Sequence, residues 1–315
     1  MDRAADSPEL LDGALDPDIL AGNLRDLARV NRWLGGTALT RHALITLLRD
    51  VHRASLRRVA GTHYGGQPIT LLDVGTGAAD IPETLVAWMA RRGVDLRVVA
   101  IDPRREILDA AFQRVGDRHD LRLDIAQGDR LAYEAGAFDV VHTSLVMHHL
   151  EPGEAARLIA EMARVSRVGV IVNDLDRSRL GWLGALVISR FFTRNPYTRH
   201  DAPLSVRRAY RPSEVARMAS RAGLVEVARA RGFLGHRYAL AFAHAPMPAD
   251  PTRRVDPAHV PQPVEVVAEA QASAAAQASA AAQPVEVVAS GQPPEALTDA
   301  PQPGDPAQPG RIGAD

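Results

Sequence analysis

The chain of 315 residues has no cysteine, no lysine, only 4% aromatic residues and no long uninterrupted hydrophobic run. Without cysteine there can be no disulfide framework, no cysteine-ligated zinc and no cysteine nucleophile. The longest apolar stretch, residues 180–192, contains Arg190 and falls short of the roughly 20 residues that span a bilayer. The acidic N-terminus lacks the basic start and apolar core of a secretory signal. We therefore expect a cytoplasmic protein with no transmembrane segment.

Charge and proline are unevenly distributed along the chain. Residues 246–315 hold 13 of the 22 prolines, no aromatic residue and a net charge of −6, whereas residues 1–245 carry +5. The heptapeptide QPVEVVA occurs twice in this tail, at 262–268 and 283–289. Such low-complexity composition predicts a disordered Pro/Ala-rich acidic tail, whose two repeats could dock a partner protein. Neither part is basic enough to predict a nucleic-acid partner.

From residue 69 onward, short apolar runs alternate with helical patterns, which is typical of βαβ units and a mostly parallel sheet. We expect helices near 80–92, 104–115, 153–165 and 212–222. The last two strands form a hairpin. The expected strands are 69–74, 96–101, 121–126, 138–143, 168–173, 224–230 and 236–243. The sequence therefore predicts an α/β, Rossmann-like seven-stranded sheet with its last strand antiparallel.

The remaining segments complete the expected domain, which covers residues 21–245. Apolar residues at helical spacing over 21–60, interrupted at Gly35 and Gly36, predict an N-terminal helical cap of two helices. Residues 1–20, with breaks at Pro8, Gly13 and Pro17, are expected to be flexible. Residues 176–211 lie between the fifth strand and the next helix, and we expect them to form an inserted lid.

The strongest local signal is the run ITLLDVGTGAAD over residues 69–80, a strand that leads into a glycine-rich turn and a helix. Gly75 and Gly77 allow the backbone to approach a ligand, and the helix N-terminus offers free N–H groups. A dinucleotide fingerprint requires a small residue where this chain has Asp80, whose carboxylate would face a pyrophosphate. Asp73 adds a second carboxylate beside the turn, so the pattern favours a cationic ligand over NAD.

The segment from Asp73 to Ala79 resembles the first motif of class I S-adenosylmethionine-dependent methyltransferases of the small-molecule branch, with a loose similarity to ubiquinone and menaquinone methyltransferases. It departs from the motif at Ala79, where the family has glycine. The resemblance implies that the glycines cradle the methionine part of S-adenosylmethionine, with Asp73 near its ammonium group. It also implies that Asp102 takes the ribose hydroxyls and that Asp129 binds the adenine amino group. The full cofactor-binding set that it implies is Asp73, Gly75, Thr76, Gly77, Asp102, Pro103, Asp129, Arg130 and Thr143.

Methyl transfer also needs a base when the acceptor is a phenol, an enol or a protonated amine. His148 and His149 follow the fourth strand, near the reaction face of the family, although they could equally shape the pocket. Asp174, after the fifth strand, is a second candidate, and the pair His200–Asp201 is a third. No metal site is expected.

The predicted lid combines an apolar run with a polar end, which suits a flat, hydrophobic or lipid-tailed acceptor. Alternatively, its apolar residues only pack the lid onto the core. The candidate substrate residues are Trp182, Arg194, Tyr197 and His200.

Together these features predict methyl transfer from S-adenosylmethionine to oxygen or carbon of a small hydrophobic acceptor, such as a phenol, a quinone precursor or a polyketide-like molecule. RNA or protein methylation, an NAD(P)-dependent oxidoreductase and a non-catalytic scaffold protein remain as alternatives. The oligomeric state is not predicted.

Overall fold

A computed structural model describes residues 1–4, 7–13, 16–56, 68–128 and 130–245, with backbone only for residues 50–56. The predicted tail over 246–315 and the predicted adenine ligand Asp129 lie outside the described residues. No helix in the described part of the chain has the length and apolar character needed to cross a membrane.

Seven strands form one sheet in the order β3-β2-β1-β4-β5-β7-β6. The chain crosses from β3 on one side of β1 to β4 on its other side, so the order reverses between β1 and β4. All neighbouring pairs from β3 to β5 are parallel, and β7 is antiparallel to both β5 and β6. This confirms the predicted fold class and the closing hairpin. The strands are β1 (Ile69–Val74), β2 (Leu96–Asp102), β3 (Leu121–Ile125), β4 (Phe138–Ser144), β5 (Ser166–Leu175), β6 (Leu224–Arg231) and β7 (Arg237–His244).

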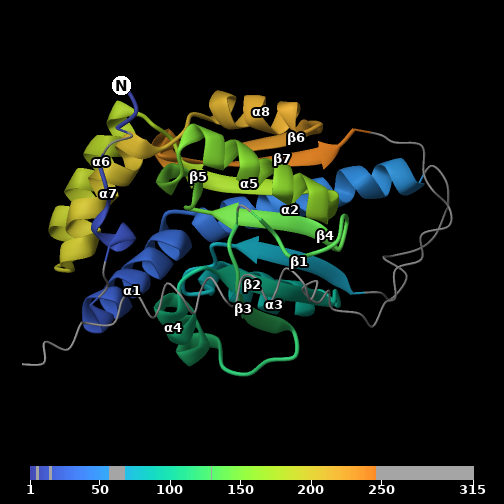
Figure 1. Cartoon of the computed structure of the whole chain (residues 1–315), viewed down its shortest axis with the longest axis horizontal. Coiled ribbons are helices and arrows are strands. Elements are labelled where there is room, and N and C mark those ends of the chain that lie inside the picture. Colours follow the sequence, from blue (N-terminus) through green and yellow to red (C-terminus); the bar gives the residue numbers. More distant parts are fainter. Residues whose placement is uncertain (5–6, 14–15, 57–67, 129, 246–315) are drawn as a thin grey trace, which may run out of the picture.

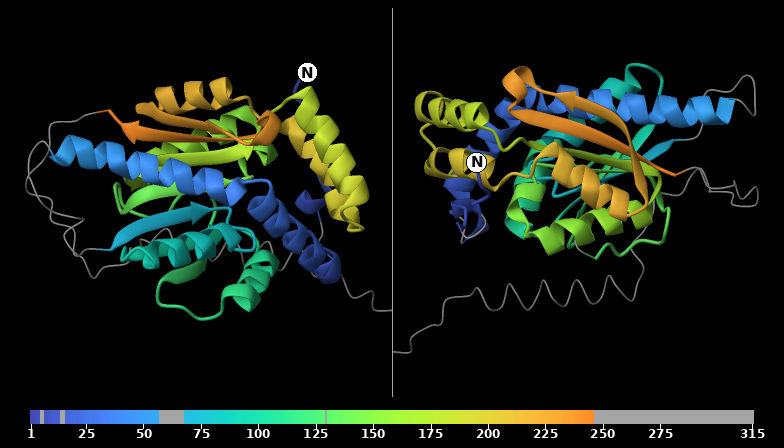
Figure 2. Two further views of the ribbon diagram at one scale, coloured as in Figure 1. Left: turned by 180° about the vertical axis from the view of Figure 1, so that it is seen from behind. Right: turned by 90° about the horizontal axis from the view of Figure 1, so that it is seen from above.

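Helices cover both faces of the sheet, each over its own apolar core. Helices α5 and α8 pack on one face, whereas α2, α3 and α4 contribute to the core on the other. Figure 2 shows α2 and α3 in front of the sheet when the molecule is seen from behind. The α-helices are α1 (Pro17–Trp33), α2 (Gly36–Leu56), α3 (Asp80–Ala90), α4 (Arg105–Val115), α5 (Pro152–Val165), α6 (Arg179–Phe191), α7 (Pro196–Arg208) and α8 (Pro212–Arg221). The short 3₁₀ helices are η1 (Leu10–Asp12), η2 (Met147–His149) and η3 (Phe233–Gly235).

Helices α1, α6 and α7 gather beyond the carboxyl ends of the parallel strands (Figure 1). Leu20 and Leu24 of α1 pack against Ile107 of α4. The second helix of the predicted cap behaves differently, because α2 packs along β5, β6 and β7. Its apolar stripe, which includes Leu44 and Leu47, is buried in the core of that face. α2 is therefore a layer of the fold, and α1 is the N-terminal helix that lies at the ligand-binding edge.

The N-terminal segment is more structured than the flexible start that the sequence predicted. Pro17 occupies the first turn of α1, and the Asp16 carboxylate caps this helix. Before it, the N–H groups of Leu10 and Leu11 donate to the Asp201 carboxylate of α7 at 2.8 and 3.0 Å. A proline in the first turn begins a helix instead of breaking it, because that turn needs no N–H at this position. The N-terminal segment is therefore fastened to the predicted lid.

Candidate functional site

The turn after β1 and the loop after β4 meet at the point where the strand order reverses. Open α/β sheets bind ligands in this crevice. Gly75 has a φ of +71°, and a Cβ at this position would lie 2.3 Å from a methyl carbon of Val146 in the loop after β4. Only glycine allows both this conformation and this close approach.

Gly77 is the residue of the turn with open space beside its backbone. Its φ is +57°, and a Cβ built on it would have no atom within 4 Å. Its N–H donates to the Asp102 carboxylate at 3.2 Å. Two residues later, Ala79 also has a left-handed conformation, with φ of 54°. This conformation costs a non-glycine residue about 1–2 kcal/mol, which is a physical reason for the family's glycine at this position.

Asp102 ends β2 and lies next to the glycine-rich turn. One carboxylate oxygen accepts the Gly77 N–H, and the other accepts the Arg104 N–H at 3.1 Å. Burial raises the pKa of Asp102 to about 6 in spite of these hydrogen bonds. A carboxylate has about four acceptor positions, so further donors can bind it.

The other members of the predicted cofactor set lie near the carboxyl ends of neighbouring strands. Thr76 is buried, and its hydroxyl has no partner among the described residues. The Thr143 hydroxyl donates to the Val74 carbonyl at 2.9 Å, so it joins β4 to β1. Pro103 and Arg130 are exposed, in the loops after β2 and β3.

Asp73 is held in a buried polar network that the sequence did not reveal. Its carboxylate is hydrogen-bonded to Nδ1 of the buried His142 on the neighbouring strand β4. Nε2 of His142 lies 3.1 Å from the Thr40 hydroxyl of α2, which accepts a hydrogen bond from Asn173 at 2.7 Å. The strand register brings Asp73 opposite His142, and that pairing could not be derived from local sequence.

The same network continues through a fully buried arginine, Arg237, at the start of β7. Its guanidinium donates to Asn173, Asn31 and Ser144 at 2.6–2.7 Å, and burial lowers its pKa to about 10. Asn31 of α1 donates to the Asp80 carboxylate at 3.0 Å. Burial raises the pKa of Asp80 above its ordinary value. The Asp80 carboxylate, which the sequence analysis placed opposite the pyrophosphate of a dinucleotide, is turned into this network.

Two of the three base candidates form a buried pair at the carboxyl ends of β4 and β5. Nδ1 of His148 lies 2.7 Å from the Asp174 carboxylate, and both side chains are almost completely buried. Burial alone would raise the pKa of Asp174, but the attraction of the His148 ring and the hydrogen bonds it receives outweigh burial and lower that pKa. If Asp174 accepts the Nδ1 proton, Nε2 of His148 is left as a proton acceptor.

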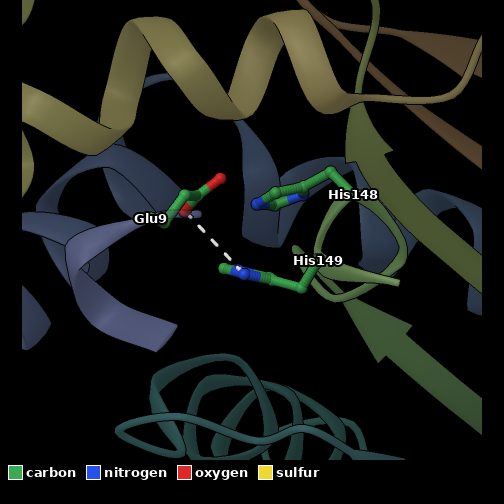
Figure 3. A group of neighbouring side chains, drawn as sticks. All are labelled: Glu9, His148 and His149. Carbon is green, nitrogen blue, oxygen red and sulfur yellow. Dashed lines mark ion pairs between the residues drawn. The ribbon is translucent and has the colours of Figure 1, made fainter. Parts of the chain in front are cut away.

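His149 and the previously unsuspected Glu9 complete a cluster around His148 (Figure 3). Nδ1 of His149 lies 2.9 Å from the Asp12 carboxylate and 3.8 Å from that of Glu9. Figure 3 shows the Glu9 carboxylate directed toward the two imidazoles. Glu9, His148 and His149 each bring one ligand-type atom within 4.8 Å of the others, a set that could hold a divalent ion although the sequence predicted none. Burial raises the pKa of Glu9 to about 7.

Arg208 of α7 fastens this cluster in place. Its guanidinium donates to the carbonyls of His148 and His149 at 3.1 and 2.8 Å, and to the Asp12 carboxylate at 2.9 Å. It also donates to the Ser7 carbonyl at 3.0 Å. One residue of α7 thus joins the N-terminal segment to the loop after β4. Arg208 is about 60 positions from His148 and about 200 positions from Ser7 in the sequence. No local motif could therefore predict these contacts.

The structure separates the four predicted substrate residues. Trp182 and His200 line a common open cavity of about 550 Å³. Tyr197 is buried and its hydroxyl accepts the Asp16 N–H at 3.0 Å, whereas Arg194 is exposed between α6 and α7. Nδ1 of His200 lies 2.7 Å from Asp201. The cavity residues are Ser7, Pro8, Trp182, His200, Pro203, Leu204 and Arg207.

Comparisons with known proteins agree with this geometry. Residues 71–169 match a family described as "Methyltransferase domain". A curated relative, the demethylmenaquinone methyltransferase of Roseiflexus sp. (strain RS-1), is 31% identical over 110 residues, which are 34% of this chain and 42% of the relative. The match thus spans less than half of that relative's length.

Solved structures are similar to this chain at low sequence identity. Human N-acetylserotonin methyltransferase is 13% identical with a TM-score of 0.51, over 73% of this chain and 57% of that chain. A methyltransferase from Aquifex aeolicus is 16% identical with a TM-score of 0.48, over 74% of this chain and 100% of that chain.

The sheet order and the likeness to this human methyltransferase show a Rossmann-like fold. Residues 71–169, from β1 into β5, are similar to a methyltransferase domain. This confirms the predicted resemblance to class I S-adenosylmethionine-dependent methyltransferases.

Proposed function

We propose that the chain is an enzyme that transfers a methyl group from S-adenosylmethionine to oxygen or carbon of a small hydrophobic acceptor. The observation that carries this proposal is the turn after β1, which lies inside the family match. Gly77 leaves open space beside its backbone, and Asp102 is buried next to it.

The residues around this turn fit the cofactor. Gly75 and Gly77 would hold its methionine part, and the unpartnered Thr76 hydroxyl is available to a ligand. The Asp102 carboxylate has acceptor positions left for two ribose hydroxyls. When bound, S-adenosylmethionine supplies an electrophilic methyl group on a sulfonium, so the protein mainly positions the acceptor and excludes water.

His148 is the base in this proposal. Asp174 orients the ring from one side, so Nε2 can take the proton of a phenol or enol acceptor. Glu9, with a pKa of about 7, lies in the same cluster, with one carboxylate oxygen within 4.8 Å of a His148 ring nitrogen. His148→Ala should lower turnover by about 10²–10⁴-fold and leave cofactor affinity unchanged. His119→Ala, at an exposed histidine before β3 and outside this cluster, is the control. Equal turnover of His148→Ala and the wild type would exclude His148 as the base.

The acceptor is proposed to be a phenol or quinone-type molecule. The curated relative is named for demethylmenaquinone. The cavity beside α6 and α7 offers Trp182, Pro203 and Leu204 as an apolar lining, with His200 and Arg207 as polar groups. Such a lining suits a flat hydrophobic molecule with a polar substituent.

Calorimetric titration with S-adenosylmethionine, S-adenosylhomocysteine, NAD and NADP in parallel tests the cofactor. We expect micromolar binding of the first two alone. Transfer of labelled methyl groups to a panel of phenols, quinones, RNA and protein then tests the acceptor class. Binding of only a nicotinamide would overturn the proposal in favour of an oxidoreductase, and binding of none would favour a scaffold protein.

A further inference from the structure

Helix α6 carries an exposed apolar stripe along one side. Leu180, Leu183, Val187 and Phe191 recur at intervals of three and four residues, which places them on one face of the helix. Leu183 is 51% exposed and Phe191 is 80% exposed. The alternative that Leu183, Val187 and Phe191 pack the lid onto the core is therefore wrong, whereas Leu186 is half-buried. The opposite side of α6 buries Gly181 and Ser189 instead.

This apolar surface continues beyond the helix. Phe192 follows directly and is 78% exposed. Figure 1 places α6 at the outer edge of the molecule, away from the sheet. We call these residues the α6 surface: Leu180, Leu183, Val187, Phe191 and Phe192. A gathering of exposed large apolar side chains marks an interaction site.

The segment that contains α6 carries charge of one sign. Residues 179–200 contain no aspartate or glutamate. The same stretch has four arginines, all of them exposed: Arg179, Arg190, Arg194 and Arg199. Helices that lie in the interface of membranes combine Leu and Phe on one side with basic residues, which attract anionic lipids.

We propose that the α6 surface docks on the surface of an anionic lipid bilayer. A second copy of the chain is a poorer occupant, because a symmetric dimer would place the same four arginines opposite one another. Docking does not depend on the proposed methyl transfer. It would serve that reaction, because Trp182 of α6 lines the cavity and a lipid-tailed acceptor could reach it from the bilayer.

Co-sedimentation of the full chain with vesicles tests the proposal. We expect binding to vesicles of equal parts phosphatidylglycerol and phosphatidylcholine, and little binding to phosphatidylcholine alone. The double variant Leu183→Asp/Phe191→Asp should abolish sedimentation. Arg190→Gln and Arg194→Gln should each weaken it about fivefold, because a basic residue near an anionic surface contributes about 1 kcal/mol. The matched control is Phe112→Asp, since Phe112 is 55% exposed on the distant helix α4.

Two further measurements show whether each variant is folded. They are its affinity for S-adenosylhomocysteine and its melting temperature, each compared with the wild type. These readouts keep docking separate from the proposed function, since an enzyme without lipid affinity would still bind the cofactor. Failure of the wild type to sediment, or equal sedimentation of Leu183→Asp/Phe191→Asp, would overturn the proposal. If the wild type does not sediment and the double variant halves the mass measured by gel filtration, a second copy covers the α6 surface instead.

Discussion

At the scale of single residues, alanine substitutions of Gly77 and Gly93 separate the cost of backbone strain from an effect on ligand binding. Their φ angles are +57° and +71°, and a Cβ on either would meet no atom within 4 Å. Alanine at each position should therefore cost about 1–2 kcal/mol of unfolding free energy, from the left-handed conformation alone. Only Gly77→Ala adds a methyl group beside Asp102, where the cofactor would approach.

We expect Gly77→Ala to weaken S-adenosylmethionine binding at least about tenfold, as 1.4 kcal/mol of steric cost would. Gly93→Ala, in the turn after α3, should bind like the wild type. Calorimetry measures the cofactor affinities. Urea unfolding measures the loss of unfolding free energy that we expect in both variants. Identical cofactor affinities of the two variants would remove Gly77 from the site.

Asp102 should make cofactor binding depend on pH. Burial raises its pKa to about 6, so its carboxylate is ionised at pH 7 and mostly protonated at pH 5. A protonated carboxyl is a poorer acceptor for ribose hydroxyls, so affinity should fall by about tenfold from pH 7 to pH 5. Asp102→Asn should bind more weakly at pH 7, by about 1–3 kcal/mol, with a flatter pH profile. A wild-type affinity that does not change between these pH values would contradict the ribose role.

At the scale of elements, the N-terminal segment that contains η1 should respond to pH through Glu9. The pKa of Glu9 rises from 4.5 to about 7 on folding, chiefly through burial. Because the folded state holds this proton more tightly, the stabilisation is complete below about pH 4.5 and is lost as pH rises through 7. Glu9→Gln should therefore raise the unfolding free energy at pH 8 by about 2–3 kcal/mol and have a smaller effect at pH 5.

Urea unfolding at both pH values measures this difference. Glu106→Gln makes the same chemical change on the exposed side of α4 and is the control. A gain that is equal at pH 5 and pH 8 would show that Glu9 acts through packing and not through its charge.

The central strands β1, β2 and β4 were predictable because their apolar runs are buried on both faces of the sheet, which leaves a strong local pattern. For β1, the strand predicted from its apolar run begins and ends at the same residues as the observed strand, Ile69–Val74. The orientation of α6 was not predictable. Its periodicity shows that the helix has an apolar face, but not whether that face packs on the core or is exposed to solvent. Glu9 was missed for a related reason, since its partner Ser205 lies 196 positions away.

At the scale of the whole molecule, the candidate site joins parts of the chain that are far apart in sequence. The network below the glycine-rich turn connects α1, α3, β4, β5 and β7 through Asn31, Asp80, Ser144, Asn173 and Arg237. Sequence motifs located the residues that line the turn, because strand ends and glycines are local features. They could not show the residues that support it, whose pairing depends on sheet order and register.

Because these elements meet at one place, a ligand there should stabilise the whole domain. Binding to the folded state alone adds about 2.7 kcal/mol when the ligand is present at 100 times its dissociation constant. For a domain of this size, 1 kcal/mol corresponds to about 2–4 °C. S-adenosylhomocysteine at that concentration should therefore raise the melting temperature by about 5–10 °C, and NAD at the same concentration should not. Gly93→Ala should keep the full shift, whereas Gly77→Ala should lose most of it. A shift in both variants would place the ligand away from the turn after β1, even if binding itself is confirmed.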